Sequence, residues 1–202
     1  MCEILKIGQR IPDISFDAYD PNERAFKTIR TSDIQKSGRW MIFFFYPADF
    51  TFVCPTELKD LSDKYDELNK LGVEVISFST DTKFTHLAWK DSEPLLRNVK
   101  FLMGADPTGK IARLLGVYDE DSGLARRGTF IFSPEGRLLS VEISFDNVGR
   151  NADELLRKVK AHIYISKHPD EACPARWKEG DMTLKPSEAL VGRVGEVLGE
   201  KG

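Results

Sequence analysis

The clearest pattern of apolar and polar positions lies between residues 40 and 80. Residues 40–46 (WMIFFFY) form an unbroken apolar run, which is typical of a strand covered on both faces in a central parallel sheet. Residues 55–71 predict a helix, because leucine and tyrosine recur there at spacings of three and four positions. Residues 73–79 (VEVISFS) predict the next strand. A strand, a helix and a strand within about 40 residues make a βαβ unit and indicate an α/β fold.

Later segments extend this pattern along the chain. The expected strands are residues 99–103, 129–132 and 138–145, the last two joined as a hairpin by Ser133-Pro-Glu-Gly136. The expected helices are residues 83–92, a short stretch at 110–115, and one that opens near Asn151. Apolar periodicity stops after His168. We therefore expect a domain of residues 1–168, followed by an arm of residues 169–202 that lies over its surface.

Composition and charge narrow the classes of function. The chain has 29 basic and 32 acidic side chains, and its formal charge of −3 gives no electrostatic reason to bind nucleic acid. Its longest apolar run falls far short of the ~20 residues needed to cross a bilayer, and its first residues lack the apolar stretch of a signal peptide. Three cysteines, Cys2, Cys54 and Cys173, are too few for a disulfide framework. We expect a cytoplasmic protein that binds neither nucleic acid nor membrane and whose important cysteines are reactive.

Cys54 is the strongest candidate for a reactive side chain. It follows a strand and a loop and directly precedes the helix at Pro55, where unpaired N–H groups and partial positive charge favour a thiolate over a thiol. A helix end contributes ~0.3–1 kcal/mol, whereas a partly buried guanidinium at ~4 Å contributes about 4 kcal/mol at an effective dielectric constant near 20. A thiolate at Cys54 therefore needs an arginine from elsewhere in the chain.

Position alone leaves other interpretations of Cys54 open, including a small buried apolar residue. A C-x-x-C redox pair is excluded because residue 57 is glutamate, and a phosphatase loop because residue 60 is aspartate rather than arginine. The histidines and cysteines show no spacing typical of zinc ligands, so we expect no metal. A cysteine protease stays formally open, although nothing near Cys54 supports it. We expect His86 to pack in the protein or lie on its surface.

The segments around two of the cysteines carry a resemblance to a known family. Residues 47–57 (PADFTFVCPTE) resemble the P-x-x-x-T-x-x-C active-site motif of the peroxiredoxins. Residues 171–180 (EACPARWKEG) resemble the resolving-cysteine segment of typical 2-Cys members. Arg127-Gly-Thr-Phe130 and Val148-Gly-Arg150 match two arginine positions of the family. The likeness covers nearly the whole chain and includes features that resemble peroxiredoxins of the bacterial alkyl hydroperoxide reductase type.

The resemblance implies a thioredoxin-like α/β fold with a central mixed sheet, and a thiol-dependent peroxidase that needs no cofactor. It assigns Cys54 as the cysteine that attacks the peroxide and becomes a sulfenic acid. Thr51 would hydrogen-bond the peroxide, and Pro47 would wall the pocket. Arg127 would hold the thiolate and the charge that develops on the departing oxygen. The resemblance also implies that Glu57 and Arg150 fix Arg127 or its neighbours.

The same resemblance implies how the sulfenic acid is resolved. Cys173 of the partner subunit would attack the sulfenic sulfur and form an intersubunit disulfide with Cys54. A disulfide needs Cα atoms within roughly 7 Å, so the helix start and the tail would unwind locally. The expected partners are a peroxide and a disulfide-reducing protein, either a flavoprotein disulfide reductase or a protein of the thioredoxin type. The chain is expected to form a homodimer, and five such dimers a ring.

The implied role is antioxidant defence and redox homeostasis. A competing interpretation is a redox-controlled holdase that covers unfolded chains with its oligomer surface.

Overall fold

The structure of the protein is a computed structural model that describes residues 3–199 of the 202-residue chain. Its internal contacts divide the chain into two compact units, with the boundary between Ala152 and Asp153. The first unit contains the whole sheet and Cys54, and the second contains Cys173. The two cysteines of the expected disulfide therefore belong to different units.

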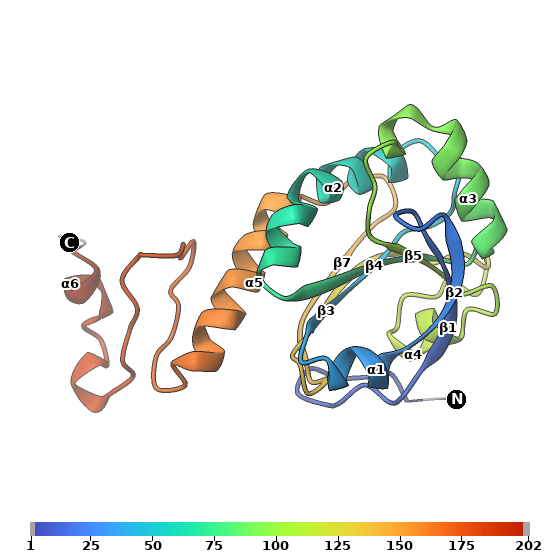
Figure 1. Cartoon of the computed structure of the whole chain (residues 1–202). Helices are drawn as coiled ribbons and strands as arrows, with labels where there is room; N and C mark the ends of the chain where they lie inside the picture. The colour runs from blue at the N-terminus through green and yellow to red at the C-terminus, as the bar shows by residue number, and fades with distance from the viewer. Residues whose placement is uncertain (1–2, 200–202) are drawn as a thin grey trace. The chain divides into compact units, whose positions relative to one another are not determined.

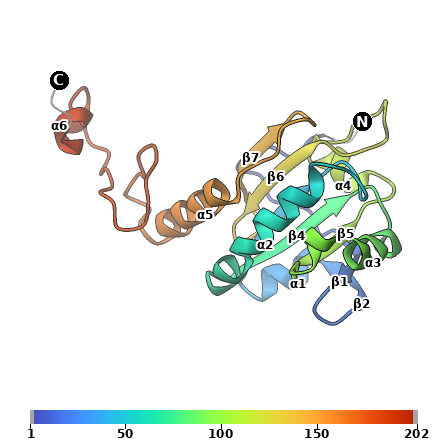
Figure 2. The same cartoon turned by 90° about the horizontal axis from the view of Figure 1, so that it is seen from above.

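One mixed sheet forms the framework of the first unit (Figures 1 and 2). Within the described residues its seven strands run in the order β2-β1-β5-β4-β3-β6-β7. The strands are β1 Ser15–Asp20, β2 Ala25–Arg30, β3 Trp40–Phe45, β4 Val73–Ser79, β5 Leu102–Ala105, β6 Arg127–Phe132 and β7 Leu138–Ser144. The helices are α1 Thr31–Lys36, α2 Cys54–Lys70, α3 Lys83–Ser92, the 3-10 turn η1 Pro94–Leu96 and α4 Lys110–Leu114. A mixed sheet flanked by helices is what the family resemblance implies.

The central strand β3 supplies side chains to both layers of the core. All of its residues are buried, as its apolar run predicts. Met41, Phe43 and Phe45 join a cluster that includes Ile111 of α4. Phe44 faces the other side, because alternate residues of a strand point to opposite faces. Figures 1 and 2 show α2 along this other face, opposite to α4.

The βαβ unit predicted around β3 is confirmed. β3 and β4 are parallel, with Trp40 opposite Val73, and α2 connects them. The other neighbour of β3 is β6, which runs antiparallel. The apolar run by itself indicated a central parallel sheet, and on this side of β3 that indication is wrong: such a run reports burial on both faces but not the direction of the neighbouring strands. The predicted hairpin of β6 and β7 is confirmed.

Elements that precede β3 were not predicted from the sequence. β1 and β2 form an antiparallel hairpin at one edge of the sheet, and α1 follows directly. Burial in β2 alternates residue by residue, which is typical of an edge strand with one solvated face. Its polar residues interrupt the apolar ones, so the sequence shows no clear strand pattern there. The strand expected at residues 99–103 instead spans Leu102–Ala105, since the buried Val99 and Phe101 belong to the loop before it.

The second unit begins at Asp153, the second residue of α5 (Ala152–Lys167), and continues into the segment that carries Cys173 (Figure 2). An isolated bridge pairs Ala172 with Leu184, and two short turns follow, η2 Glu188–Leu190 and α6 Val194–Leu198. Trp177 ties this segment to α5, because its ring lies 5.0 Å from that of Tyr164, centroid to centroid. Within residues 3–199, no helix has the length and apolar character needed to cross a bilayer.

Candidate active site

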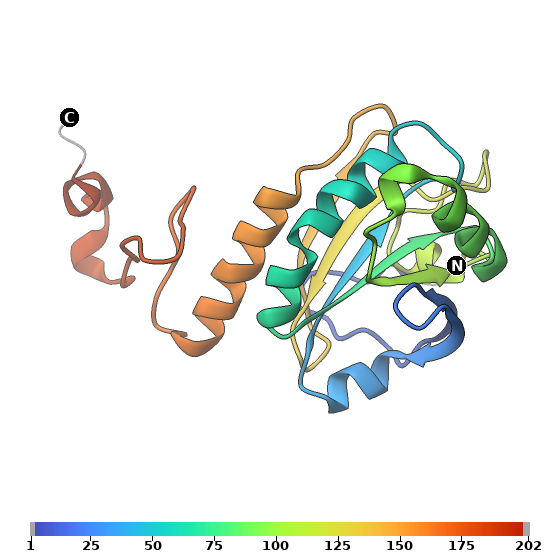
Figure 3. The same cartoon turned by 45° about the horizontal axis from the view of Figure 1, so that its top comes forward.

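Cys54 is the first residue of α2 and is fully buried. The loop of residues 46–53 leaves the end of β3 and leads into this first turn (Figure 3). Val53 occupies the N-cap position, and its side chain makes no capping hydrogen bond. Pro55 stands in the first turn, where its missing N–H costs the helix nothing, as predicted. A helix start without a side-chain cap leaves its partial positive charge available to an anion such as a thiolate.

Arg127 reaches the sulfur of Cys54 from a distant part of the sequence. It is the first residue of β6, and its Nη1 lies 3.4 Å from Cys54 Sγ. The same nitrogen donates to Glu57 Oε2 at 2.6 Å, and Nε donates to the carbonyl of Asp146 at 2.8 Å. A guanidinium is planar, so these bonds fix both its position and its orientation. Arg127 thus places a cation in direct contact with this thiol, as the resemblance implies.

Glu57 joins Arg127 to a second buried arginine. Arg150 donates to Glu57 Oε1 through both its backbone N–H and its Nε, each at 2.8 Å, and to Oε2 through Nη2 at 3.1 Å. Its Nη1 donates to the Thr129 hydroxyl at 3.0 Å, and its guanidinium lies 3.5 Å from the centre of the Phe44 ring. The three charged side chains are each at most 4 % exposed. Glu57 thus holds both guanidinium groups in a site that water scarcely reaches.

The charged side chains joined near the Cys54 sulfur are two cations and one anion. Arg127 and Arg150 carry two positive charges, and Glu57 supplies one negative charge. Arg127 Nη1 lies 3.4 Å from that sulfur. For a negative charge at this distance the Coulomb attraction alone is about 5 kcal/mol at an effective dielectric constant of ~20, compared with ~0.3–1 kcal/mol for a helix end. Of these two interactions, the one with the guanidinium is the stronger.

Burial lowers the pKa of each of the two arginines, whereas ion pairing raises it. For Arg127, burial disfavours the charged form, but the contacts with Cys54 and Glu57 outweigh it and raise the pKa. For Arg150, burial dominates over the contact with Glu57 and lowers the pKa. A guanidinium stays protonated even after such a decrease. The Cys54 sulfur therefore faces a cation at every pH of practical interest.

The loop before Cys54 contains the two other predicted residues of the pocket. Pro47 is buried at the beginning of the loop, and Thr51 is half-buried three residues before Cys54. The Thr51 hydroxyl donates to the Ala48 carbonyl at 2.8 Å. Its proton is thereby used within the loop, and the lone pairs of the oxygen remain to accept a hydrogen bond from a bound molecule.

Cys173 lies in the second unit, half-exposed beside a cavity of about 450 Å³. Arg157 and His162 of α5 line the same cavity. Burial raises the pKa of the Cys173 thiol, and the charge of Arg157 acts against that increase. Arg157 is itself held by Glu154 at 2.6 Å and by the Trp177 carbonyl at 3.1 Å. The segment around Cys173 is thus fixed to α5 by a charged side chain and an aromatic contact.

Part of the predicted site is therefore gathered in one place. Cys54, Glu57, Arg127 and Arg150 are joined by direct contacts. Sequence reasoning missed the groups that hold the arginines from behind, namely the Asp146 carbonyl, the Thr129 hydroxyl and the Phe44 ring. A backbone carbonyl leaves no signal in a sequence, and Phe44 was assigned only to the core. Among residues 3–199, no three His, Cys, Asp or Glu side chains are grouped as metal ligands would be.

Comparison with known proteins agrees with this geometry. The family model described as AhpC/TSA matches residues 7–141, which include Cys54, Glu57 and Arg127. The chain belongs to the AhpC/TSA family and is a peroxiredoxin. It is 51% identical over 174 residues to alkyl hydroperoxide reductase C of Salmonella typhimurium, covering 85% of this chain and 93% of that protein. It is 46% identical over 188 residues to the protein of the same name from Staphylococcus haemolyticus, covering 93% and 98%.

Solved structures of this family share the fold. The crystal structure of Enterococcus faecalis AhpC is 47% identical, with a TM-score of 0.79 over 83% of this chain and 98% of the other. The reduced 2-Cys peroxiredoxin of Plasmodium vivax is 30% identical, with a TM-score of 0.84 over 91% and 94%. The expected thioredoxin-like peroxiredoxin fold is thereby confirmed.

The buried charge cluster leads to a prediction about stability. We expect Glu57→Gln to lower the free energy of unfolding by about 3–5 kcal/mol, because two buried guanidinium groups lose their shared anion. Urea denaturation of the reduced protein measures this change. Asp63→Asn is a matched control on the same helix, since its carboxylate pairs with Lys59 at a half-exposed position, and it is expected to cost only about 0.3–0.5 kcal/mol. Similar small losses in both variants would contradict the assignment of Glu57.

Proposed function

We propose that the protein is a thiol-dependent peroxidase that reduces hydrogen peroxide and organic hydroperoxides at Cys54. The observation that carries this proposal is the contact between Arg127 Nη1 and the buried Cys54 sulfur. A thiolate is the nucleophilic form of cysteine, and here it is held by a fixed cation at the start of a helix. The family, and the printed names of relatives that share about half of their residues with this chain, support the same chemistry.

In the proposed first step, the Cys54 thiolate attacks the terminal oxygen of the peroxide. A sulfur–oxygen bond forms, the oxygen–oxygen bond breaks, and the sulfur gives up two electrons to become a sulfenic acid. The departing oxygen leaves as water or an alcohol after it takes a proton. Arg127 faces the charge that moves from the sulfur to that oxygen, so it stabilises the transition state as well as the thiolate. Thr51 accepts the hydrogen bond of the peroxide O–H, and Pro47 shields the pocket from water.

In the proposed second step, Cys173 of the partner subunit attacks the sulfenic sulfur. A disulfide forms and the sulfenic oxygen leaves as water, so the two thiols together supply the electrons that reduce the peroxide. Burial of Cys54 at a helix start means that the first turn of α2 unwinds before this bond can form. The arm of residues 169–202 delivers the resolving cysteine to the domain of residues 1–168 in a neighbouring copy.

The cycle closes when a protein dithiol reduces the disulfide. We propose a flavoprotein disulfide reductase or a thioredoxin-type protein as this reductant, and the cytoplasm, which is kept reducing, as the compartment. The intersubunit bond requires at least a homodimer, and a ring of five dimers is the assembly that we propose. The cell would use such an enzyme to remove peroxides and maintain its redox balance.

Replacement of Cys54 tests the chemistry of the first step. We expect Cys54→Ser to lose peroxide consumption down to the rate of the reductant alone, because a hydroxyl is not ionised at neutral pH. The assay follows peroxide loss with a small dithiol reductant in excess. Cys2→Ser is the control and is expected to retain the full rate. Substantial turnover by Cys54→Ser would exclude this cysteine as the reacting group.

Replacement of Cys173 tests the second step. After one equivalent of peroxide, the wild-type protein should migrate as a covalent dimer on a gel run without reductant, and Cys173→Ser should show no such band. Treatment with a dithiol should return the wild-type band to the monomer position. A disulfide found within one chain by mass spectrometry, with no covalent dimer, would contradict the intersubunit bond.

A further inference from the structure

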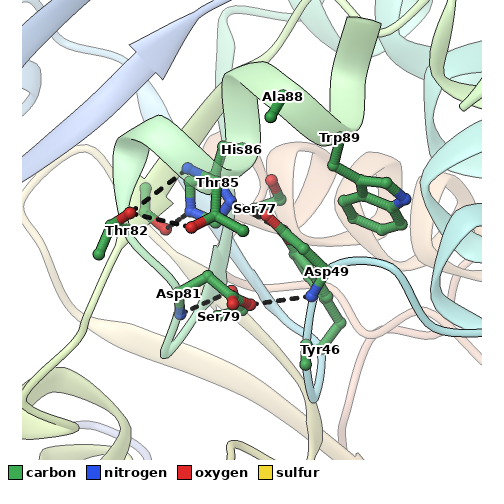
Figure 4. A network of polar contacts seen from close by, with 12 residues as sticks. Tyr46, Asp49, Ser77, Ser79, Asp81, Thr82, Thr85, His86, Ala88 and Trp89 are labelled. Atoms are coloured by element: carbon green, nitrogen blue, oxygen red, sulfur yellow. Dashed lines mark hydrogen bonds and ion pairs between the residues drawn. The ribbon is translucent and has the colours of Figure 1, made fainter. Parts of the chain in front are cut away.

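A second buried polar cluster includes two residues of the loop that precedes Cys54. Tyr46, Asp49 and His86 form it, and Figure 4 shows them between α3 and the ends of the central strands. The Asp49 carboxylate accepts from the Tyr46 hydroxyl at 2.7 Å through Oδ1 and contacts His86 Nδ1 at 2.7 Å through Oδ2. The side chains of Asp49 and His86 are completely buried. None of these groups takes part in the peroxidase steps described above.

The hydrogen bonds of His86 fix the protons of this cluster. Its Nε2 lies 3.1 Å from the Gly104 carbonyl, which can only accept, so Nε2 carries a proton. One further proton lies between Nδ1 and Asp49 Oδ2, since both atoms would otherwise present lone pairs to each other at 2.7 Å. Burial, together with Asp49, raises the pKa of Tyr46 well above its usual value, so its hydroxyl stays a donor. The pair is therefore neutral overall and fully hydrogen-bonded.

The peptide group between Ala48 and Asp49 connects this cluster to Thr51. The carbonyl of that peptide accepts the Thr51 hydroxyl at 2.8 Å, and its N–H donates to Asp81 Oδ2 at 2.8 Å. Asp81 is itself held by the Ser79 hydroxyl at 2.7 Å. The orientation of one peptide plane thus sets the direction in which the Thr51 hydroxyl gives its proton. Side-chain bonds of Asp49 hold the next Cα in place.

The backbone of the loop is strained at Phe50, so the residues beside it must be held firmly. Phe50, between Asp49 and Thr51, has a φ of 55°, a left-handed conformation that a bulky side chain rarely adopts. Its ring is largely exposed and makes only a distant contact with Trp89, with 6.2 Å between ring centroids. A strained residue of this kind persists when its neighbours are firmly held. The fixed neighbour here is Asp49.

We propose that His86, acting through the Asp49 carboxylate, is a positioning residue that holds the Ala48–Thr51 turn in the geometry that presents the Thr51 oxygen to the peroxide. The inference rests on the proposed peroxidase function. His86 belongs to α3, which the chain reaches only after β4, and it takes no part in the chemistry at the sulfur. Its effect should therefore fall on the step that needs Thr51 and leave the thiolate, which Arg127 holds, unchanged.

Two reactions of Cys54 separate these effects. Oxidation by hydrogen peroxide needs both the thiolate and a correctly placed Thr51, whereas alkylation by iodoacetamide needs only an accessible thiolate. Both rate constants are measured on the full chain in a Cys173→Ser background, with the Cys54 peptide followed by mass spectrometry. The variants are His86→Gln, whose amide reaches about as far as Nε2, and His86→Asn, whose amide reaches about as far as Nδ1.

We expect His86→Gln to slow oxidation by peroxide about 10- to 100-fold, because the turn loses its hold on Asp49. Its alkylation rate should stay within about twofold of that of the parent protein, since the thiolate is unaffected. His86→Asn keeps a donor for Asp49 and should recover a clear part of the peroxide rate. Should His86→Gln fail to fold, Tyr46→Phe makes the same comparison, because it deletes only the hydroxyl that donates to Asp49; it should also slow oxidation selectively.

Four outcomes would overturn the inference. Unchanged peroxide oxidation in the folded variants would show that His86 does not position the loop. An equal decrease in the rates of oxidation and alkylation would show that the cluster has only a structural role. An oxidation rate of His86→Asn no higher than that of His86→Gln would show the same. If the parent protein itself shows no faster reaction with peroxide than a free thiol, the proposed function fails first, and the inference fails with it.

Discussion

One guanidinium nitrogen connects the chemistry of this protein to its fold. Arg127 Nη1 contacts the Cys54 sulfur at 3.4 Å and the Glu57 carboxylate at 2.6 Å. This double contact is possible because β6 begins at Arg127, next to β3, and because α2 begins at Cys54 and brings Glu57 round by one turn. The start of β6 and the first turn of α2 are thus held together by the same bonds that, in the proposed function, prepare the thiol for reaction.

Burying these charges has a cost, and the arrangement of the cluster shows how the fold offsets it. A buried arginine without a full set of partners is strongly destabilising. Here Arg150 uses its backbone N–H, Nε and both terminal nitrogens, and its flat face rests on Phe44. Glu57 is the carboxylate that the two arginines share. In the proposed function the Cys54 thiolate is a further anion beside Arg127, and its oxidation would remove that charge from the contact.

The sequence predicted the parts of the fold that depend on local pattern. The apolar run of β3, the three-and-four spacing of α2 and the position of Pro55 are enough by themselves to locate Cys54 at a helix start. Local pattern shows only that a thiolate at Cys54 needs a cation nearby. It does not identify Arg127, because 73 positions separate the two residues. The family resemblance pointed to Arg127. The hairpin of β1 and β2 escaped prediction because β2 (AFKTIR) mixes polar and apolar residues without alternation, although the alternating residues of β1 (SFDAYD) are a strand signal. His86 was expected to pack or lie on the surface, and its bonds to Asp49 and the Gly104 carbonyl had no signal, since they join segments that only the folded sheet brings together.

The most direct test of the account measures how much of Cys54 is ionised at neutral pH, with and without Arg127. Cys2 and Cys173 are replaced by serine, so that the ultraviolet absorbance of the thiolate reports Cys54 alone. The account predicts that the parent protein is largely ionised at neutral pH and that Arg127→Gln is largely a neutral thiol, with the fold of both checked by circular dichroism. A Cys54 thiol that titrates like that of a free cysteine, or that ionises equally well in the folded Arg127→Gln variant, would contradict it.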